Sequence, residues 1–98
     1  MKARLLLDRR VILTPEVFAE MVLWKVPAPL AGGDHDYKYR LALVAHGKCV
    51  LRYDNEAGKG GHVHRQESEQ PYRFRSVDRL IQDFMKDVKE WLRENRDS

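Results

Sequence analysis

The strictest constraint on the fold is the alternation of side chains over residues 37–54, YKYRLALVAHGKCVLRYD. Two segments rich in apolar residues flank His46 and Gly47, and on both sides apolar side chains tend to recur at every second position. A period of two is that of a β-strand with one buried face, and a glycine between two such segments marks a turn. The pattern therefore predicts a β-hairpin.

The same pattern predicts the register of this hairpin. A loop of three residues, 45–47, with Val44 opposite Lys48 separates apolar from charged side chains, whereas a loop of His46 and Gly47 alone mixes them on both faces. The three-residue loop also puts its glycine where a left-handed backbone is needed. The expected core face then collects Tyr37, Tyr39, Leu41, Leu43, Cys49, Leu51 and Tyr53.

In this register Arg40 and Arg52 are expected to face each other on the polar side of the hairpin, with Lys38 opposite Asp54. Two like charges opposite each other are unfavourable without a counterion, unless they extend into water. Paired guanidinium groups also suit a phosphate, which they can hold by several hydrogen bonds. Both interpretations of the arginine pair stay open at this point.

A C-terminal helix is predicted over about residues 77–95. Ser76 can cap its first turn. Apolar side chains then recur at steps of three and four residues, which gives one stripe that can cover a sheet. The stripe consists of Val77, Leu80, Ile81, Phe84, Val88, Trp91 and Leu92.

Residues 14–26 carry two conflicting signals. The segment Thr14-Pro15-Glu16 resembles the start of a helix. The content of β-branched and aromatic residues that follows favours a strand, and we predict a strand. Further expectations are a strand over 1–13 with a bulge at 8–10, a loop over 27–36 and a short strand at 72–74.

These elements predict an α+β fold: a mostly antiparallel sheet of about four to five strands, within about residues 2–74, with one C-terminal helix on one face. At 98 residues the chain suits a single domain, 1–98. The net charge of +3 is compatible with an anionic partner without demanding one. One cysteine, Cys49, allows no intramolecular disulfide, and the charged N-terminal segment suits neither a signal peptide nor a membrane span. A cytoplasmic protein is expected.

Residues 52–64, RYDNEAGKGGHVH, hold the densest group of candidate functional side chains. GKGG lacks the spacing of a P-loop, so we interpret it as a hinge, with Lys59 available for a phosphate contact. His62 and His64 point the same way if the backbone is extended. Such a pair suits metal binding, with Asp54 or His35 as a third ligand, or acid–base cleavage of a phosphodiester without a metal. Two exposed loop histidines would give the same pattern.

The segments KYRLALV, GKCVLRYDNEAGKGGHVH, PYRF and SVDRLIQDFMKDVKEW together resemble small bacterial toxins of the TumE type, over roughly residues 18–92. The resemblance implies a toxin whose partner is an antitoxin, often a helix-turn-helix DNA-binding protein. It carries over to Arg52, Asp54, Asn55, His62 and His64.

The function expected from residues and resemblance together is that of a toxin that binds RNA and cleaves it without a cofactor. His62 and His64 would act as general acid and base, with Asp54 orienting one of them. Arg40, Arg52, Lys59 and Asn55 would contact the phosphates. Two alternatives stay open: a metal-dependent hydrolase that uses His62, His64 and Asp54, and a non-catalytic module that binds a protein through a strand.

Overall fold

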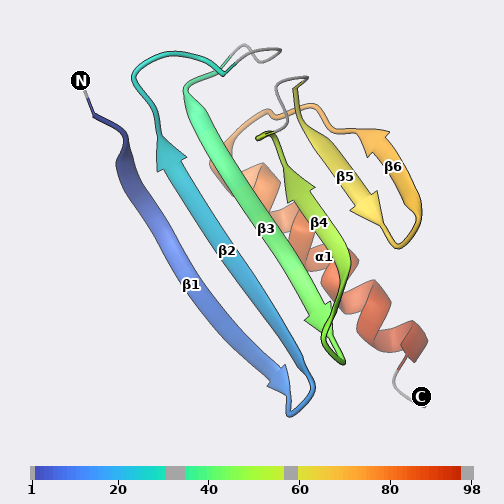
Figure 1. Cartoon of the computed structure of the whole chain (residues 1–98). Helices are drawn as coiled ribbons and strands as arrows, with labels where there is room; N and C mark the ends of the chain where they lie inside the picture. The colour runs from blue at the N-terminus through green and yellow to red at the C-terminus, as the bar shows by residue number, and fades with distance from the viewer. Residues whose placement is uncertain (1, 31–34, 57–59, 96–98) are drawn as a thin grey trace.

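The fold is one antiparallel sheet backed by one helix, and strands that are neighbours in sequence are neighbours in the sheet (Figure 1). The computed structural model describes residues 2–30, 35–56 and 60–95. The expected α+β class and the C-terminal helix are confirmed, but the sheet has six strands where four to five were predicted. The elements are β1 (Arg4–Thr14), β2 (Val17–Lys25), β3 (Tyr37–Ala45), β4 (Lys48–Asp54), β5 (His62–Arg65), β6 (Ser68–Pro71) and α1 (Val77–Asn95).

The ambiguous segment 14–26 contains strand β2, as predicted. The preceding strand β1 also forms, but its bulge is not at 8–10, where residues pair regularly with β2. The irregularities lie instead between Leu5 and Leu7 and between Ile12 and Thr14. The charged residues 8–10 need no bulge, because β1 is an edge strand whose polar side chains reach water directly.

The turn between β3 and β4 has two residues, so the predicted three-residue loop is wrong. Ala45 pairs with Lys48, and both turn residues have positive φ, 52° for His46 and 77° for Gly47. Two successive positive φ values define the type I′ turn, whose twist matches that of the flanking strands. The glycine is therefore left-handed as expected, but in a shorter turn.

A register shift next to this turn restores the expected core face. Val44 pairs with Cys49, and the register then changes so that Leu43 pairs with Leu51 and Leu41 with Tyr53. All four residues of the last two pairs are buried. Cys49 is the exception to the predicted face, because it lies before the shift, opposite Val44, and is exposed.

The last two strands form a short hairpin that the sequence did not indicate. β6 spans Ser68–Pro71 and pairs with β5, and the predicted strand at 72–74 is absent from the described chain. All four residues of β6 are exposed. A strand without an apolar face carries no period-two pattern, so it is invisible to sequence analysis.

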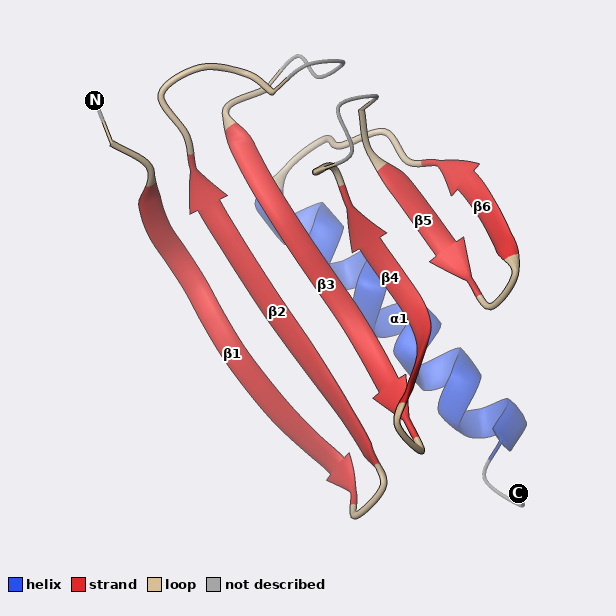
Figure 2. Ribbon diagram, viewed as in Figure 1, coloured by secondary structure: helices blue, strands red, loops and turns tan. Residues whose placement is uncertain are grey.

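Helix α1 covers one face of the sheet and lies behind the strands in the view of Figure 2. The Ser76 hydroxyl accepts a hydrogen bond from Arg79 N at 3.1 Å, which is the expected cap. Leu80, Phe84 and Val88 are buried against the sheet. No helix in the described ranges is long and apolar enough to cross a membrane. Core side chains from the sheet are Val17, Ala19, Met21, Leu23, Tyr39, Leu41, Leu43, Ala45, Leu51, Tyr53 and Val63.

Candidate functional site

The face of the sheet that α1 leaves uncovered, here called the open face, brings most of the predicted site residues together. Strand β5 pairs directly with β4, with Arg52 opposite His64 and Asp54 opposite His62. Side chains opposite each other in a sheet lie on the same face. The two histidines therefore share a surface with the β4 residues by strand pairing, and no hinge has to swing them there.

The predicted direct pairing of Arg40 with Arg52 is wrong. Arg40 lies opposite Asp54, and Arg52 lies opposite Ala42. The register shift moves β4 by two positions relative to the prediction, so each residue keeps its face but changes its neighbour. Lys38 is accordingly not opposite Asp54, and its ammonium group lies 3.6 Å from Glu56. The two arginines remain diagonal neighbours on the open face.

Asp54 contacts an arginine. Its Oδ2 lies 2.6 Å from Arg52 Nε. Asp54 itself is only 8% exposed. A carboxylate removed from water needs a partner of opposite charge, and the guanidinium supplies it. The ion pair places the Arg52 guanidinium beside Asp54, and its terminal nitrogens can then meet another anion.

The residue that contacts the histidines is Glu69 on β6. Its Oε1 lies 3.3 Å from His62 Nδ1, and its Oε2 lies 3.6 Å from His64 Nδ1. The two imidazole centroids are 6.2 Å apart. Sequence analysis missed Glu69 because β6 itself was not predicted. The available signal was an acid after the H-x-H pair, which a two-residue turn at 66–67 returns to His64.

A carboxylate at Nδ1 has a defined chemical effect on an imidazole. Where Nδ1 donates to the carboxylate, the neutral ring carries its proton on Nδ1, and Nε2 is then the nitrogen that can accept a proton. His64 is partly exposed, with 27% of its side chain accessible, and can meet a substrate from solvent. His62 is 7% exposed, and its Nε2 is buried without a hydrogen-bond partner in the described part of the chain.

Asn55, which was also predicted to contact phosphate, has a different role. Asn55 is buried; its side-chain oxygen accepts from Tyr39 N at 3.0 Å, and its amide donates to Tyr37 O at 2.8 Å. Both polar ends of Asn55 therefore hold the start of β3. Lys59 lies outside the described residues.

The glycine segment is described only from Gly60 onward. Within it, Gly61 lies where a side chain would collide with neighbouring atoms. A Cβ atom at Gly61 would lie 2.5 Å from Tyr72 O and 2.6 Å from Tyr39 Oη. Gly61 O also accepts a hydrogen bond from Tyr72 N at 2.9 Å. This part of the predicted hinge is thus packed against the chain that leads to α1.

A metal centre is not formed by the candidate ligands as they stand. Within residues 2–30, 35–56 and 60–95, no group of three His, Cys, Asp or Glu side chains is placed to hold a metal ion. His35, the alternative third ligand, stacks on Phe74 with ring centroids 4.1 Å apart.

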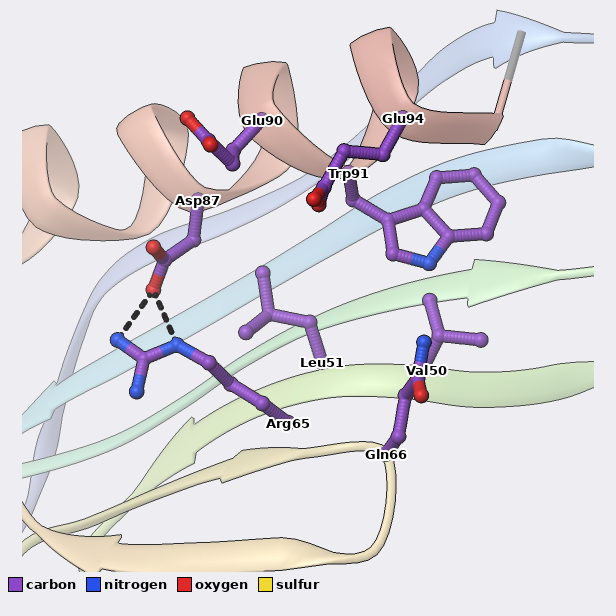
Figure 3. A pocket seen from close by; sticks show the side chains of 8 residues that line it. All are labelled: Val50, Leu51, Arg65, Gln66, Asp87, Glu90, Trp91 and Glu94. Carbon is purple, nitrogen blue, oxygen red and sulfur yellow. Dashed lines mark hydrogen bonds and ion pairs between the residues drawn. The ribbon is translucent and has the colours of Figure 1, made fainter.

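On the helix side, a separate cavity of about 230 Å³ lies between α1 and strands β4 and β5 (Figure 3). An ion pair crosses it, with Arg65 Nη2 2.8 Å from Asp87 Oδ2. The Tyr53 hydroxyl also donates to Asp87. The cavity contains no histidine, so the acid–base candidates belong to the open face alone. Its lining residues are Val50, Leu51, Arg65, Gln66, Asp87, Glu90, Trp91 and Glu94.

Comparison with known proteins places the chain in one family. The model of the family described as Toxin TumE matches residues 2–92. No curated protein matches the chain. No solved structure matches it either.

Proposed function

Since the chain belongs to the TumE toxin family, and is thereby the toxin component of a toxin–antitoxin pair, we propose that it is a ribonuclease that acts without a metal ion. The observation that carries the proposal is the shared contact of His62 and His64 with Glu69, directly beside Arg52. Two imidazoles and a guanidinium on one face of the sheet, with His64 the more exposed of the two histidines, are groups that suit cleavage of a phosphodiester.

The proposed reaction is an internal transfer in RNA. One imidazole removes the proton of a 2′-hydroxyl, and the resulting oxygen attacks the adjacent phosphorus. The bond from phosphorus to the 5′-oxygen breaks, and the other imidazole gives that oxygen a proton. The products are a 2′,3′-cyclic phosphate and a 5′-hydroxyl, so atoms and charges balance without a co-reactant. DNA is not a substrate, because it lacks the 2′-hydroxyl.

The cations supply binding and charge stabilisation. Arg52 is diagonal to Arg40 and opposite His64, so one phosphate can contact both the guanidinium and an imidazole. The charge on the phosphate oxygens grows in the transition state, and a fixed guanidinium stabilises it more than the ground state. Asp54 holds Arg52 in place for this role.

The test is cleavage of a 30-nucleotide RNA of mixed sequence, in EDTA, by purified protein without a histidine tag. Wild type is expected to produce 2′,3′-cyclic phosphate ends, and the His62→Ala/His64→Ala variant is expected to lose at least about a hundredfold in rate. His46→Ala, at the β3–β4 turn, is the matched control and should retain activity. RNA left intact by wild type would refute the ribonuclease. Cleavage only with added Mg²⁺ or Mn²⁺ would favour the metal-dependent hydrolase instead.

The proposal also includes the type of antitoxin that binds this toxin. We propose a helix-turn-helix protein encoded beside the toxin, on the strength of the family membership alone. Co-purification of the neighbouring gene product with the toxin tests it. Loss of RNA cleavage in that complex would support both the ribonuclease activity and its inhibition by this antitoxin. Stable association with a toxin that never cleaves RNA would favour the non-catalytic module.

A further inference from the structure

The two outer edges of the sheet are built differently. β6 is four residues long, ends in Pro71 and is otherwise polar, features that discourage pairing with another strand. β1 at the opposite edge is 11 residues long, and no strand in the described part of the chain pairs with its outer side (Figure 1). Its unpaired backbone groups form a template for a further strand.

Strand β1 also carries exposed apolar side chains. The large hydrophobic residues that are exposed in the described ranges are Leu5, Leu6 and Ile12, at 45%, 43% and 66%. All three belong to β1. Single exposed apolar residues are ordinary, but their concentration on one unpaired edge marks a contact surface.

The sequence of β1 is complementary to itself when two copies run antiparallel. Asp8 and Arg10 point to the open face, opposite Val22 and Glu20 of β2, so Arg9 points to the helix side. Opposite residues in a continuous sheet must share a face, so a symmetric pairing has to be centred on a residue. Centring on Arg9 puts Asp8 of each copy opposite Arg10 of the other.

The neighbouring registers are worse. In the Arg9-centred pairing Leu7 of each copy also faces Val11 of the other, so apolar meets apolar and acid meets base. Centring on Asp8 puts two carboxylates face to face, and centring on Arg10 puts two guanidinium groups face to face. The cost of the favoured register is one contact between the two Arg9 side chains, both of which are exposed.

We propose that this protein forms a symmetric dimer through β1, in which two sheets join into one across Asp8–Arg10 pairs. The two-fold axis is perpendicular to the sheet, so both helices lie on one side and both open faces on the other. The two candidate sites then share one surface. The inference of a dimer rests on the edge strand β1 alone and does not depend on the proposed ribonuclease activity.

A charge-swap series tests the interface by sedimentation equilibrium. Asp8→Arg or Arg10→Asp is expected to weaken dimerisation by about tenfold or more, because each turns two attractive pairs into two repulsive ones. The double variant Asp8→Arg/Arg10→Asp restores opposite charges and should recover most of the affinity. A monomeric wild type, or a dimer that tolerates each single substitution, would overturn the proposal.

Two controls separate association from folding. Arg10 also stacks on the Phe18 ring, 3.9 Å from its centroid, so thermal unfolding must be measured for each variant. Ile12 is 66% exposed, so Ile12→Lys leaves the core unchanged. This variant is expected to weaken the dimer as well. Ser68→Arg, on the opposite edge, should leave dimerisation unchanged. Equal weakening by Ser68→Arg would show that charge in general, and not β1, controls association.

Discussion

His64 on β5 lies directly opposite Arg52 on β4. The pair joins a partly exposed proton acceptor to a cation that is already oriented by Asp54. An anion that enters between them meets both groups at once, which is the arrangement on which the proposed RNA cleavage depends.

Replacing Arg52 should weaken RNA binding in a salt-dependent way. Arg52→Ala removes one phosphate contact, so the slope of log affinity against log salt should fall by about 0.7 for a single strand. Binding of a 2′-O-methyl RNA, which cannot be cleaved, measures this by fluorescence anisotropy. Arg93→Ala on the outer side of α1 is the matched control, since Arg93 pairs only with exposed Glu90 in the described chain. Equal losses from both variants would contradict a specific role for Arg52.

Glu69 should act on the rate of cleavage and not on RNA binding. Glu69→Gln keeps the shape of the side chain but no longer fixes the imidazole protons, so kcat is expected to fall about tenfold or more. KM should stay unchanged or decrease, because a negative charge near the phosphate is lost. Glu69→Asp, which retains the carboxylate, should recover part of the rate. A rise in KM at constant kcat would instead indicate that Glu69 contributes to RNA binding and not to the chemical step.

The faces of the β3–β4 hairpin were predictable, but the neighbours of each residue were not. Alternation fixes only which side a residue faces, and a shift of two positions leaves that unchanged. The predicted pairing of Arg40 with Arg52 therefore failed while Leu41, Leu43, Leu51 and Tyr53 all lie in the core.

Glu69 shows the second limit of prediction from sequence. Its strand is held by backbone pairing with β5 and by a tight turn, not by apolar side chains. Nothing in the local pattern marks such a strand, although it brings the carboxylate to both histidines. The helix over 77–95, by contrast, was predictable because its cap and its apolar stripe agree.

Gly61 should tolerate no side chain. In Gly61→Ala the new Cβ would press on Tyr72 O and Tyr39 Oη, and we expect a loss of about 1–3 kcal/mol in the free energy of unfolding. Gly47 provides the contrast, since no atom lies within 4 Å of a Cβ there and only its positive φ matters. Gly47→Asn should therefore cost less, because asparagine adopts this conformation readily. Urea denaturation of both variants measures the difference, and equal costs would contradict the packing argument.

Asp87 should stabilise the contact between helix and sheet. It accepts hydrogen bonds from Tyr53 and from Arg65, the latter at 2.8 Å (Figure 3). Asp87→Ala leaves the buried Tyr53 hydroxyl without this partner and is expected to cost about 1–3 kcal/mol. Glu90→Ala also removes a helix carboxylate but breaks only an exposed pair with Arg93, and should cost less than about 1 kcal/mol. Similar losses from both, measured by urea denaturation, would show that the buried contact adds nothing.

Three tyrosines should make the fold sensitive to alkali. Burial raises the pKa of Tyr39, Tyr53 and Tyr72 above the ordinary value of 10.0, and Asp54, Asp87 and Asp83 respectively raise it further. Above pH 10 the unfolded chain loses these protons while the folded protein keeps them, so unfolding becomes more favourable as the pH rises. The free energy of unfolding should decline by up to about 1.4 kcal/mol per pH unit for each tyrosine.

Tyr39→Phe isolates one of these contributions. The Tyr39 hydroxyl is buried and has no hydrogen-bond partner within the described residues, so its removal breaks no such bond. The variant should be at least as stable as wild type at pH 7 and should lose stability less steeply above pH 10. Urea denaturation at pH 9, 10 and 11 gives both slopes, and tyrosinate absorbance near 295 nm reports ionisation. Ionisation of all tyrosines before unfolding would contradict the raised pKa values.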